Sequence, residues 1–341
     1  MSYARPLFAW PLALRIAALT GVALIAVVAA IRLGAVSLST SEILDALLGR
    51  GDATTITIVR GLRLPRAFQA SLVGAALGVS GATFQALLRN PLAEPYTLGV
   101  SSGAAAGAVL TVVTGWSARI VWSLPVAAFA GAAISMLLVF RIAYSVGADR
   151  HLDTRVLLLA GVVVSAFLIA LVWLALTFAE SDAVRSAIFW MMGSHSGASW
   201  RSVAILLACF APGFVVLLAL ARPLNLLSIG EPTAAYLGTS VERTKLLAFG
   251  AATLLTATAV SVSGTIGFVG LIVPHTIRLL WGSEHRSLLP CAALGGAAFL
   301  AATDTLARSI AGANELPIGI VTALIGVPCF VWLLRQPTVG R

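Results

Sequence analysis

The sequence predicts an all-α, polytopic membrane protein with about ten transmembrane helices and no sizeable soluble domain. Of its 341 residues, 59% are hydrophobic and only 10% are charged, and the mean hydropathy is +1.00. A soluble domain has about 25% charged residues, so this chain has too few charges to cover a water-exposed surface. These values exclude a cytosolic enzyme, a secreted disulfide scaffold and a disordered chain.

Ten apolar runs divide the chain, and most approach the length of about 20 residues that a helix needs to cross a bilayer. They lie at 12–33, 62–83, 97–115, 121–144, 155–178, 201–221, 244–263, 266–282, 288–307 and 316–334. Because little sequence remains between the runs, we expect residues 1–341 to form a single transmembrane domain.

Two segments depart from this plain pattern. Segment 39–49 opens with Ser39 and has Glu42 three residues later, the signature of a capping box, which predicts a short amphipathic helix on the outer surface. The run 266–282 is interrupted by Gly267, Gly270 and Pro274. A broken helix at membrane depth is tolerated only where protein or a water-filled cavity satisfies the freed backbone groups.

The basic residues predict the orientation in the membrane. With both termini in the cytoplasm, 13 basic residues lie inside and nine outside, which agrees with the positive-inside rule. The margin is small mainly because Arg60, Arg63 and Arg66 gather at the outer mouth of the second run. This local departure from the rule indicates a function for these three arginines.

The sequence carries no means of using ATP directly. Its one lysine, Lys245, does not stand in a G-x-x-x-x-G-K loop, so this chain does not bind nucleotide phosphates in that way. Within the apolar runs the one clear carboxylate is Asp304, and Arg308 follows four residues later, in position to pair with it. A carrier driven by protons or sodium ions usually needs more such groups, so we expect the energy to come from another subunit.

Other functions also lack support in the sequence. Cys209, Cys291 and Cys329 lie in apolar runs without metal-ligand spacing, so we expect no metal site. The arginines are scattered between the runs instead of forming one basic face, which disfavours nucleic-acid binding. A membrane enzyme of lipid or haem chemistry would need a set of catalytic residues, and we find none.

Several motifs resemble those of one transporter family. They are LRLPR (62–66), GVSGATFQ (78–85), RNPLAEP (89–95), LGVSSGA (98–104), GTIGFVGLIVPH (264–275), EHR (284–286) and ELPIG (315–319). In this order they resemble the FecCD-type permeases, the membrane subunits of ABC importers for ferric siderophores, haem and cobalamin. The resemblance extends from the second run nearly to the end of the chain.

The resemblance implies an assembly in the bacterial inner membrane. Two copies would form a homodimer with the translocation pathway along its two-fold axis, and two ATPase subunits carrying ATP and Mg²⁺ would dock on the cytoplasmic side. A periplasmic binding protein would deliver the cargo. The permease chain itself would bind no cofactor.

Segment 223–243 is predicted to contact the ATPases. Gly230 ends one short helix, Pro232 suits the first turn of a second, and Gly238 ends that one. An ordinary long loop with helical turns is the alternative. The resemblance implies coupling helices, for which we expect contact residues Leu227, Gly230, Glu231, Ala234, Ala235, Leu237 and Gly238.

Arg63, Arg66 and Arg308 match family arginines that pair with glutamates on the two lobes of the binding protein. Arg60 lies one helical turn before Arg63, and we expect it to assist docking. Contact with lipid phosphates is the alternative.

The expected pathway involves the interrupted run and two outer segments. Its candidate residues are Gly264, Gly267, Gly270, Pro274, His275, Pro317, Met191, Met192 and His195. The three glycines suit close helix packing as well as a pathway lining. His275 stands in a motif that permeases for haem-free cargo share, which favours a general role, and His195 has the alternative of a solvated loop residue.

Haem is the first cargo hypothesis, because the 180–200 loop resembles the haem permeases overall. A ferric siderophore and cobalamin follow. A self-sufficient secondary carrier or channel remains the rival from another class; its transport would survive removal of an ATPase partner.

Overall fold

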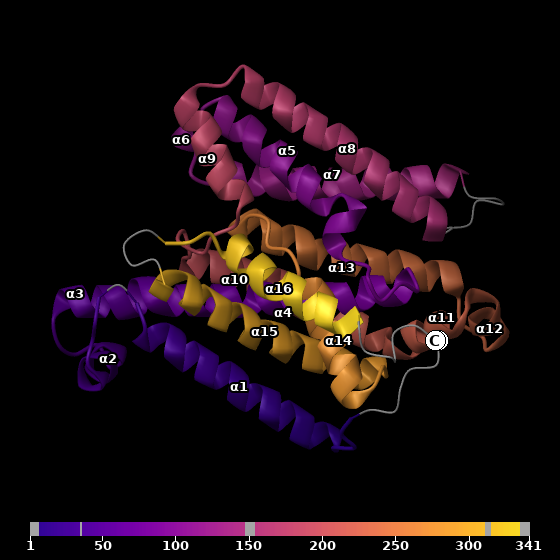
Figure 1. Cartoon of the computed structure of the whole chain (residues 1–341), viewed down its shortest axis with the longest axis horizontal. Coiled ribbons are helices and arrows are strands. Elements are labelled where there is room, and N and C mark those ends of the chain that lie inside the picture. Colours follow the sequence, from indigo (N-terminus) through magenta and orange to yellow (C-terminus); the bar gives the residue numbers. More distant parts are fainter. Residues whose placement is uncertain (1–6, 35, 147–153, 311–314, 335–341) are drawn as a thin grey trace.

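The computed structural model describes residues 7–34, 36–146, 154–310 and 315–334, and the regular structure of these residues is helical throughout (Figure 1). Seven of the helical stretches are long and apolar enough to cross a membrane. They are α1 (Leu12–Arg32), the continuous α3–η1–α4 (Ala53–Ile56, Thr57–Arg63, Leu64–Leu87), α7 (Ser123–Val146), α8 (Thr154–Thr177), α10 (Trp200–Ala219), α13 (Val241–Ser263) and α15 (His285–Ile310).

Three further apolar helices are shorter: α5 (Val100–Val113), α14 (Val269–Trp281) and α16 (Ile318–Leu334). Together these ten stretches coincide with the ten predicted runs. A helix rises about 1.5 Å per residue, so the three short helices do not reach the thickness of a hydrocarbon core by themselves. Ten complete crossings therefore remain a prediction.

Short helices mark the two ends of the molecule. Figure 1 places α2 (Thr40–Leu47) and α3 at one end of the long axis and α11 (Ala221–Ile229) and α12 (Glu231–Tyr236) at the other. Helix α2 begins at Ser39, whose hydroxyl accepts from the Glu42 amide while the Glu42 carboxylate accepts from the Ser39 amide. The remaining short elements are η2 (Pro95–Leu98), α6 (Trp116–Arg119) and α9 (Ser181–Met191).

Helix α4 runs through the centre of the protein, and its neighbours approach its backbone closely. A Cβ atom placed on Gly74 would lie 2.1 Å from the carbonyl oxygen of Gly296 in α15, and one on Gly81 would lie 1.9 Å from that of Gly270 in α14. Small residues allow membrane helices to pack backbone to backbone. The glycines of α4 therefore fix its position against α14 and α15.

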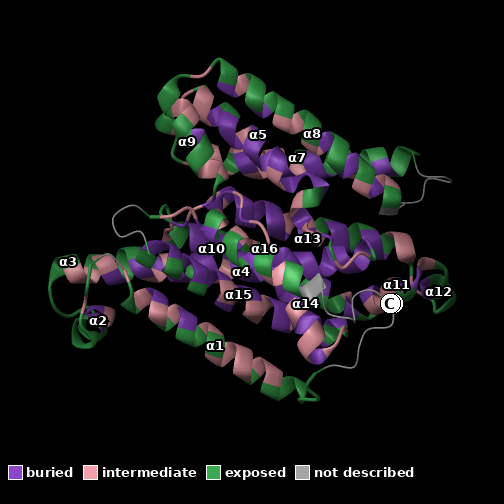
Figure 2. Ribbon diagram, in the orientation of Figure 1, coloured by how far each residue is buried: buried purple, intermediate pink, exposed green. Residues whose placement is uncertain are grey.

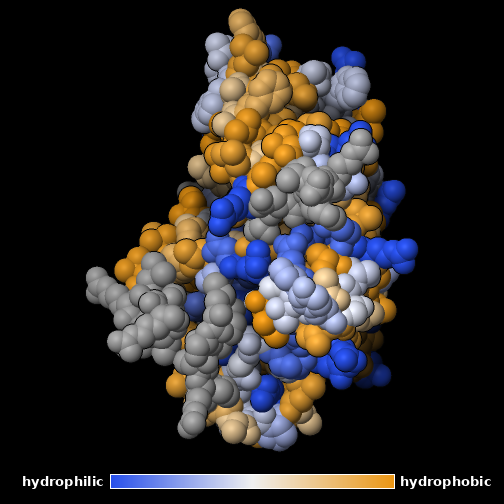
Figure 3. All heavy atoms as spheres, turned by 90° about the vertical axis from the view of Figure 1, so that its right-hand side faces the viewer, coloured by the Kyte–Doolittle hydropathy of each residue, from blue (hydrophilic) through white to orange (hydrophobic). Residues whose placement is uncertain are grey.

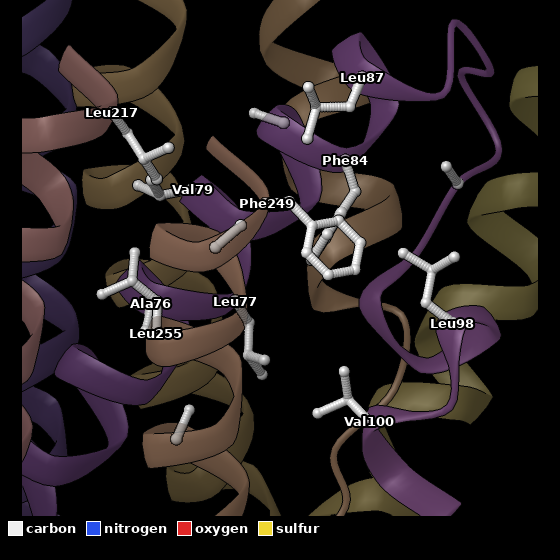
Figure 4. Close-up of a cluster of buried hydrophobic side chains, with 14 of the residues drawn as sticks. Ala76, Leu77, Val79, Phe84, Leu87, Leu98, Val100, Leu217, Phe249 and Leu255 are labelled. Carbon is white, nitrogen blue, oxygen red and sulfur yellow. The ribbon is translucent and has the colours of Figure 1, made fainter. Parts of the chain in front are cut away.

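Large apolar side chains fill the space around this helix (Figure 4). Leu77 and Phe84 of α4 are fully buried, and the Phe84 ring meets the Phe249 ring of α13 edge to face, with centroids 5.7 Å apart. Edge-to-face pairs of this kind add to the stabilisation from burial. The core is therefore continuous from α4 to α13.

Burial falls off sharply toward the flanks, as Figure 2 shows for α1 and α8. In the apolar 18-residue stretch of Ala53–Leu87, 89% is buried inside the protein. The corresponding share is 11% for α1 and 28% for α8. Apart from Arg32, Arg155 and Thr177 near the helix ends, the exposed residues of α1 and α8 are nevertheless apolar, for example Ile25 and Phe167. An apolar helix surface without a protein partner suits contact with lipid.

We expect Gly74→Ala to destabilise the protein by about 1–3 kcal/mol, the range for overpacking a tight site. Its new methyl group would meet the backbone of α15. Gly250→Ala in α13 is the matched control, because a Cβ atom there meets nothing within 4 Å. Thermal unfolding in detergent micelles measures both, and equal effects of the two substitutions would contradict the packing role of Gly74.

Candidate functional site: an ion network, two hollows and a surface segment

The α2–α3 end of the protein holds an ion network centred on Asp304, whose side chain is 1% exposed. Arg66 meets it with two nitrogens, Nε at 3.0 Å from Oδ2 and Nη2 at 3.0 Å from Oδ1. The Nη1 group of Arg66 binds the carboxylate of Glu315 at 2.8 Å, and Arg308 Nε lies 3.2 Å from Asp304 Oδ2. Pairing of this kind stabilises a buried carboxylate that would otherwise be costly.

Two predicted docking arginines instead cap the end of α1. Arg63 donates to the carbonyl oxygens of Ile31, at 2.7 Å, and of Val36. Arg308 donates to the carbonyl of Ala30 at 3.0 Å. Basic side chains commonly satisfy the free carbonyls at a helix C-terminus.

Among the four predicted docking arginines, Arg60 alone is exposed to solvent. Its guanidinium donates to the Leu47 carbonyl at 2.8 Å. Arg63 and Arg308 are buried, and Arg66 is largely covered by its carboxylate partners. This burial disfavours lipid phosphates as partners of Arg63 and Arg308. It also means that a docking protein could not reach those two guanidinium groups in this conformation.

An apolar hollow of about 680 Å³ lies where three segments meet. Met191 and Met192 contribute from the end of α9, Gly267 and Phe268 from the break between α13 and α14, and Gly319 from the start of α16. Backbone bonds join the walls: the Gly319 amide donates to the Met192 carbonyl at 3.0 Å. Apolar walls of this kind offer few fixed polar contacts to a passing molecule.

A second hollow, of about 940 Å³, is lined in part by other residues of the 189–197 segment. Arg185, Trp190, Ser194 and Pro317 are among its lining residues, and so is Glu315 of the ion network. The ion network and this hollow therefore share the residue Glu315.

The structure thus brings together only part of the predicted pathway. Met191, Met192 and Gly267 line the first hollow and Pro317 the second, and Gly264 packs against the carbonyl of Trp190. The other candidates are elsewhere: Gly270 packs on Gly81 of α4, while Pro274 and His275 are buried within α14.

His195 lies in a buried polar cluster and lines neither hollow. It is fully buried, and its Nδ1 is 3.2 Å from Nε2 of Gln69, whose Oε1 accepts from the Ser202 hydroxyl. Sequence reasoning placed His195 in an outer loop near the expected substrate entrance, with a solvated loop residue as the alternative. The partner Gln69 lies 126 residues away along the chain, so no local pattern indicated this burial.

At the opposite end, α11 and α12 form a surface segment with an alternating pattern of burial. Figure 3 faces this end and shows hydrophilic atoms gathered there. Among the predicted contact residues, the buried ones are Leu227, Gly230 and Ala234, and the exposed ones are Ala235, Leu237 and Gly238.

Two residues that sequence reasoning missed are more prominent on this segment. Ile229 is 69% and Tyr236 is 92% exposed. Both are large side chains in segment 223–243, but nothing in the local pattern distinguished them from the leucines beside them, some of which are buried.

Glu231, which we expected to contact the ATPase, instead binds residues of this chain. Its carboxylate binds Lys245 Nζ of α13 at 2.5 Å, and Arg89, at the end of α4, lies 4.0 Å from its other oxygen. Glu231 therefore ties the surface segment to two of the long helices.

Over the described ranges, no group of three or more His, Cys, Asp and Glu side chains is arranged to hold a metal ion. The described residues also form hollows between helices, a charged end and a surface segment with exposed apolar side chains. Together with the long apolar helices, these features suit a multi-pass membrane transport protein.

The chain belongs to the FecCD transport family, whose model matches residues 22–336. This confirms the resemblance seen in the motifs. The chain is 45% identical to the uncharacterized ABC transporter permease protein YvrB of Bacillus subtilis, over 86% of this chain and 83% of that one.

Two relatives carry names that state a cargo. The cobalamin import system permease protein BtuC of Halobacterium salinarum is 47% identical over 83% of this chain and 74% of its own length. The vitamin B12 import system permease protein BtuC of Escherichia coli O157:H7 is 42% identical over 81% and 82%.

Among solved structures, an inward-facing conformation of a metal-chelate type ABC transporter superposes with a TM-score of 0.83 at 33% identity. It covers 96% of this chain and all of that one. This chain is accordingly an ABC importer permease, a multi-pass protein of the inner membrane.

We expect Asp304→Asn to cost about 3–5 kcal/mol of stability, because two largely buried guanidinium groups lose their shared carboxylate. Glu315→Gln is the matched control: its carboxylate is 40% exposed, and an exposed pair contributes about 0–1 kcal/mol. Chemical unfolding of the purified protein measures both. If Glu315→Gln proved as harmful as Asp304→Asn, Asp304 would not be the centre of the network.

Proposed function

We propose that this chain is the permease of an importer for bulky metal chelates, with cobalamin as the leading cargo. The observation that carries the proposal is the apolar hollow at the α13–α14 break, lined by Met191, Met192 and Phe268. A wall with few polar groups lets a large cargo pass without binding it tightly, and selectivity then resides in the binding protein.

The choice of cobalamin over haem depends on two observations. Relatives named as cobalamin or vitamin B12 permeases are 42–47% identical to this chain. Haem, the first cargo hypothesis from the sequence, drew on the 180–200 loop, yet His195, the imidazole of that loop, is fully buried and lines neither hollow. Haem stays the second candidate because the two thioethers line the first hollow, and a ferric siderophore is the third.

A second copy of the chain would complete the pathway. The first hollow is open along α16, and the neighbouring side chains Leu324, Val327 and Trp332 are exposed and apolar. A homodimer related by a two-fold axis along this face would enclose the hollow between two copies.

The α2–α3 end is the side that we assign to the periplasm, with both termini in the cytoplasm. Arg60, Arg63, Arg66 and Arg308 outnumber the two carboxylates of Asp304 and Glu315 there, which leaves this cluster positive. A positive cluster attracts and orients an acidic partner locally, although α2 and the start of α3 also carry the carboxylates of Glu42, Asp45 and Asp52. Arg60 would contact the binding protein directly. Arg63, Arg66 and Arg308 are covered and would act only through their positive charge.

The α11–α12 segment is the docking site that we assign to the ATPase subunits. Ile229, Tyr236 and Leu237 present exposed apolar surface at the ends of the two short helices. Such side chains anchor interfaces when a partner's groove covers them. Glu231 then passes the motion of the segment to α13 through Lys245.

Reconstitution with ATPase and binding-protein partners in proteoliposomes tests this function. We expect uptake only with ATP inside and cobalamin-loaded binding protein outside. Binding protein that is empty or loaded with haem or a ferric siderophore provides the comparison. Uptake by the permease alone, indifferent to ATP, would overturn the proposal in favour of a secondary carrier, and uptake of haem alone would reassign the cargo.

We expect Tyr236→Ser to reduce co-purification of the ATPase at least tenfold, since an interface tyrosine commonly contributes about 2 kcal/mol or more. Tyr144→Ser, at an exposed tyrosine near the end of α7, is the matched control and should leave the complex intact. A pull-down with tagged ATPase measures both, and an unchanged yield for Tyr236→Ser would place the docking site elsewhere.

A further inference from the structure

The break between α13 and α14 has an irregular backbone that side chains from another segment satisfy. Within it, the amide of Phe268 donates to Glu94 Oε1 at 2.5 Å, and the amide of Ile266 donates to the Tyr96 hydroxyl oxygen at 2.8 Å. Glu94 directly precedes η2 and Tyr96 lies within it. Two neighbouring side chains thus replace the backbone acceptors that a continuous helix would supply.

This arrangement holds a strained residue in place. Phe268 has φ +70°, a left-handed conformation that is rare for a large side chain and costs about 1–3 kcal/mol. Such a residue persists only when its surroundings determine it. On one side Glu94 binds the Phe268 amide, and on the other Gly326 of α16 leaves room for the aromatic ring, since a Cβ atom there would lie 2.7 Å from the Phe268 side chain.

The same residues form a wall of the apolar hollow. Thr265, Gly267 and Phe268 all line it, so the position of the break sets the shape of the cavity. At membrane depth no water replaces a lost acceptor cheaply. Loss of the Glu94 or Tyr96 acceptor would therefore free the break to rearrange instead of leaving an amide unsatisfied.

We propose that Glu94 and Tyr96 are positioning residues of the translocation pathway: they fix the 264–268 break so that Gly267 and Phe268 stand as one wall of the hollow. This inference rests on the proposed function in one respect: the proposed function identifies the hollow as part of the pathway. Neither side chain lines the hollow, so their effect on transport would pass through the backbone of the break.

A cysteine at Ala323 of α16 reports on the hollow, because Ala323 lines it. The test uses the full chain in lipid nanodiscs with Cys209, Cys291 and Cys329 replaced by alanine, and measures the rate at which a small water-soluble maleimide labels Cys introduced as Ala323→Cys. We expect Glu94→Ala to change this rate about tenfold or more, because leaving a buried amide without its acceptor shifts a local equilibrium by about that order.

Conservative variants separate positioning from general damage. Glu94→Gln keeps an acceptor oxygen and should restore the rate to within about twofold of the parent, a margin well below one hydrogen bond. Tyr96→Phe keeps the ring but removes the acceptor, and should shift the rate in the same direction as Glu94→Ala. Glu180→Ala, at an exposed carboxylate before α9, should have no effect.

An unchanged rate in Glu94→Ala and Tyr96→Phe, or failure of Glu94→Gln to restore it, would overturn the inference. If Glu94→Ala does not fold, Glu94→Gln and Tyr96→Phe still decide it. The labelling needs no cargo, ATPase or binding protein. A failure of ATP-dependent uptake by the unaltered importer would therefore overturn the proposed function and leave this result standing.

Discussion

The close backbone packing of α4 against α15 and α14 is the constraint on which the rest of this structure depends. In a bilayer there is no hydrophobic gain from bringing two apolar helices together, so close contact between backbones has to supply the attraction. Gly74 and Gly81 permit that contact, and an added Cβ atom would overlap the facing carbonyl groups at 2.1 and 1.9 Å. The result is a central helix held between α14 and α15, with the ion network at one end and the surface segment near the other.

Both charged features of the protein are attached to this helix. At one end Arg66 joins α4 to Asp304 of α15, and at the other Arg89 follows α4 and lies 4.0 Å from Glu231 of the surface segment. The chain thus has a continuous packed element between the end that we assign to the binding protein and the end that we assign to the ATPases. A rigid helix with charged contacts at both ends is a physical basis for coupling, because displacement of one end cannot be absorbed within it.

The break between α13 and α14 contrasts with α4, because here the backbone leaves the helical conformation. A run of Gly264, Gly267 and Gly270 allows the chain to leave the helix, and the hydrogen bonds from Ile266 and Phe268 to Tyr96 and Glu94 satisfy amides that lipid could not. The hollow beside it is lined by small and apolar groups. A transport protein needs breaks of this kind, because a continuous helix cannot change its shape as a ligand passes.

The sequence by itself determined the ten apolar helices, the start of α2 at Ser39 and the family, because helix length, capping and short motifs are local properties of the chain. It also named Met191, Met192 and Gly267 as pathway candidates, and the structure places all three at one hollow; that this hollow is the pathway stays a proposal. Only the tertiary structure decided that Arg63 and Arg308 cap α1, that Glu231 binds Lys245, that His195 is buried and that Glu94 holds the break. Most of these side chains meet partners from 32 to 278 residues away along the chain. Which polar groups pair in a protein with so few charges is therefore settled by how the helices pack, and a linear pattern does not contain that information.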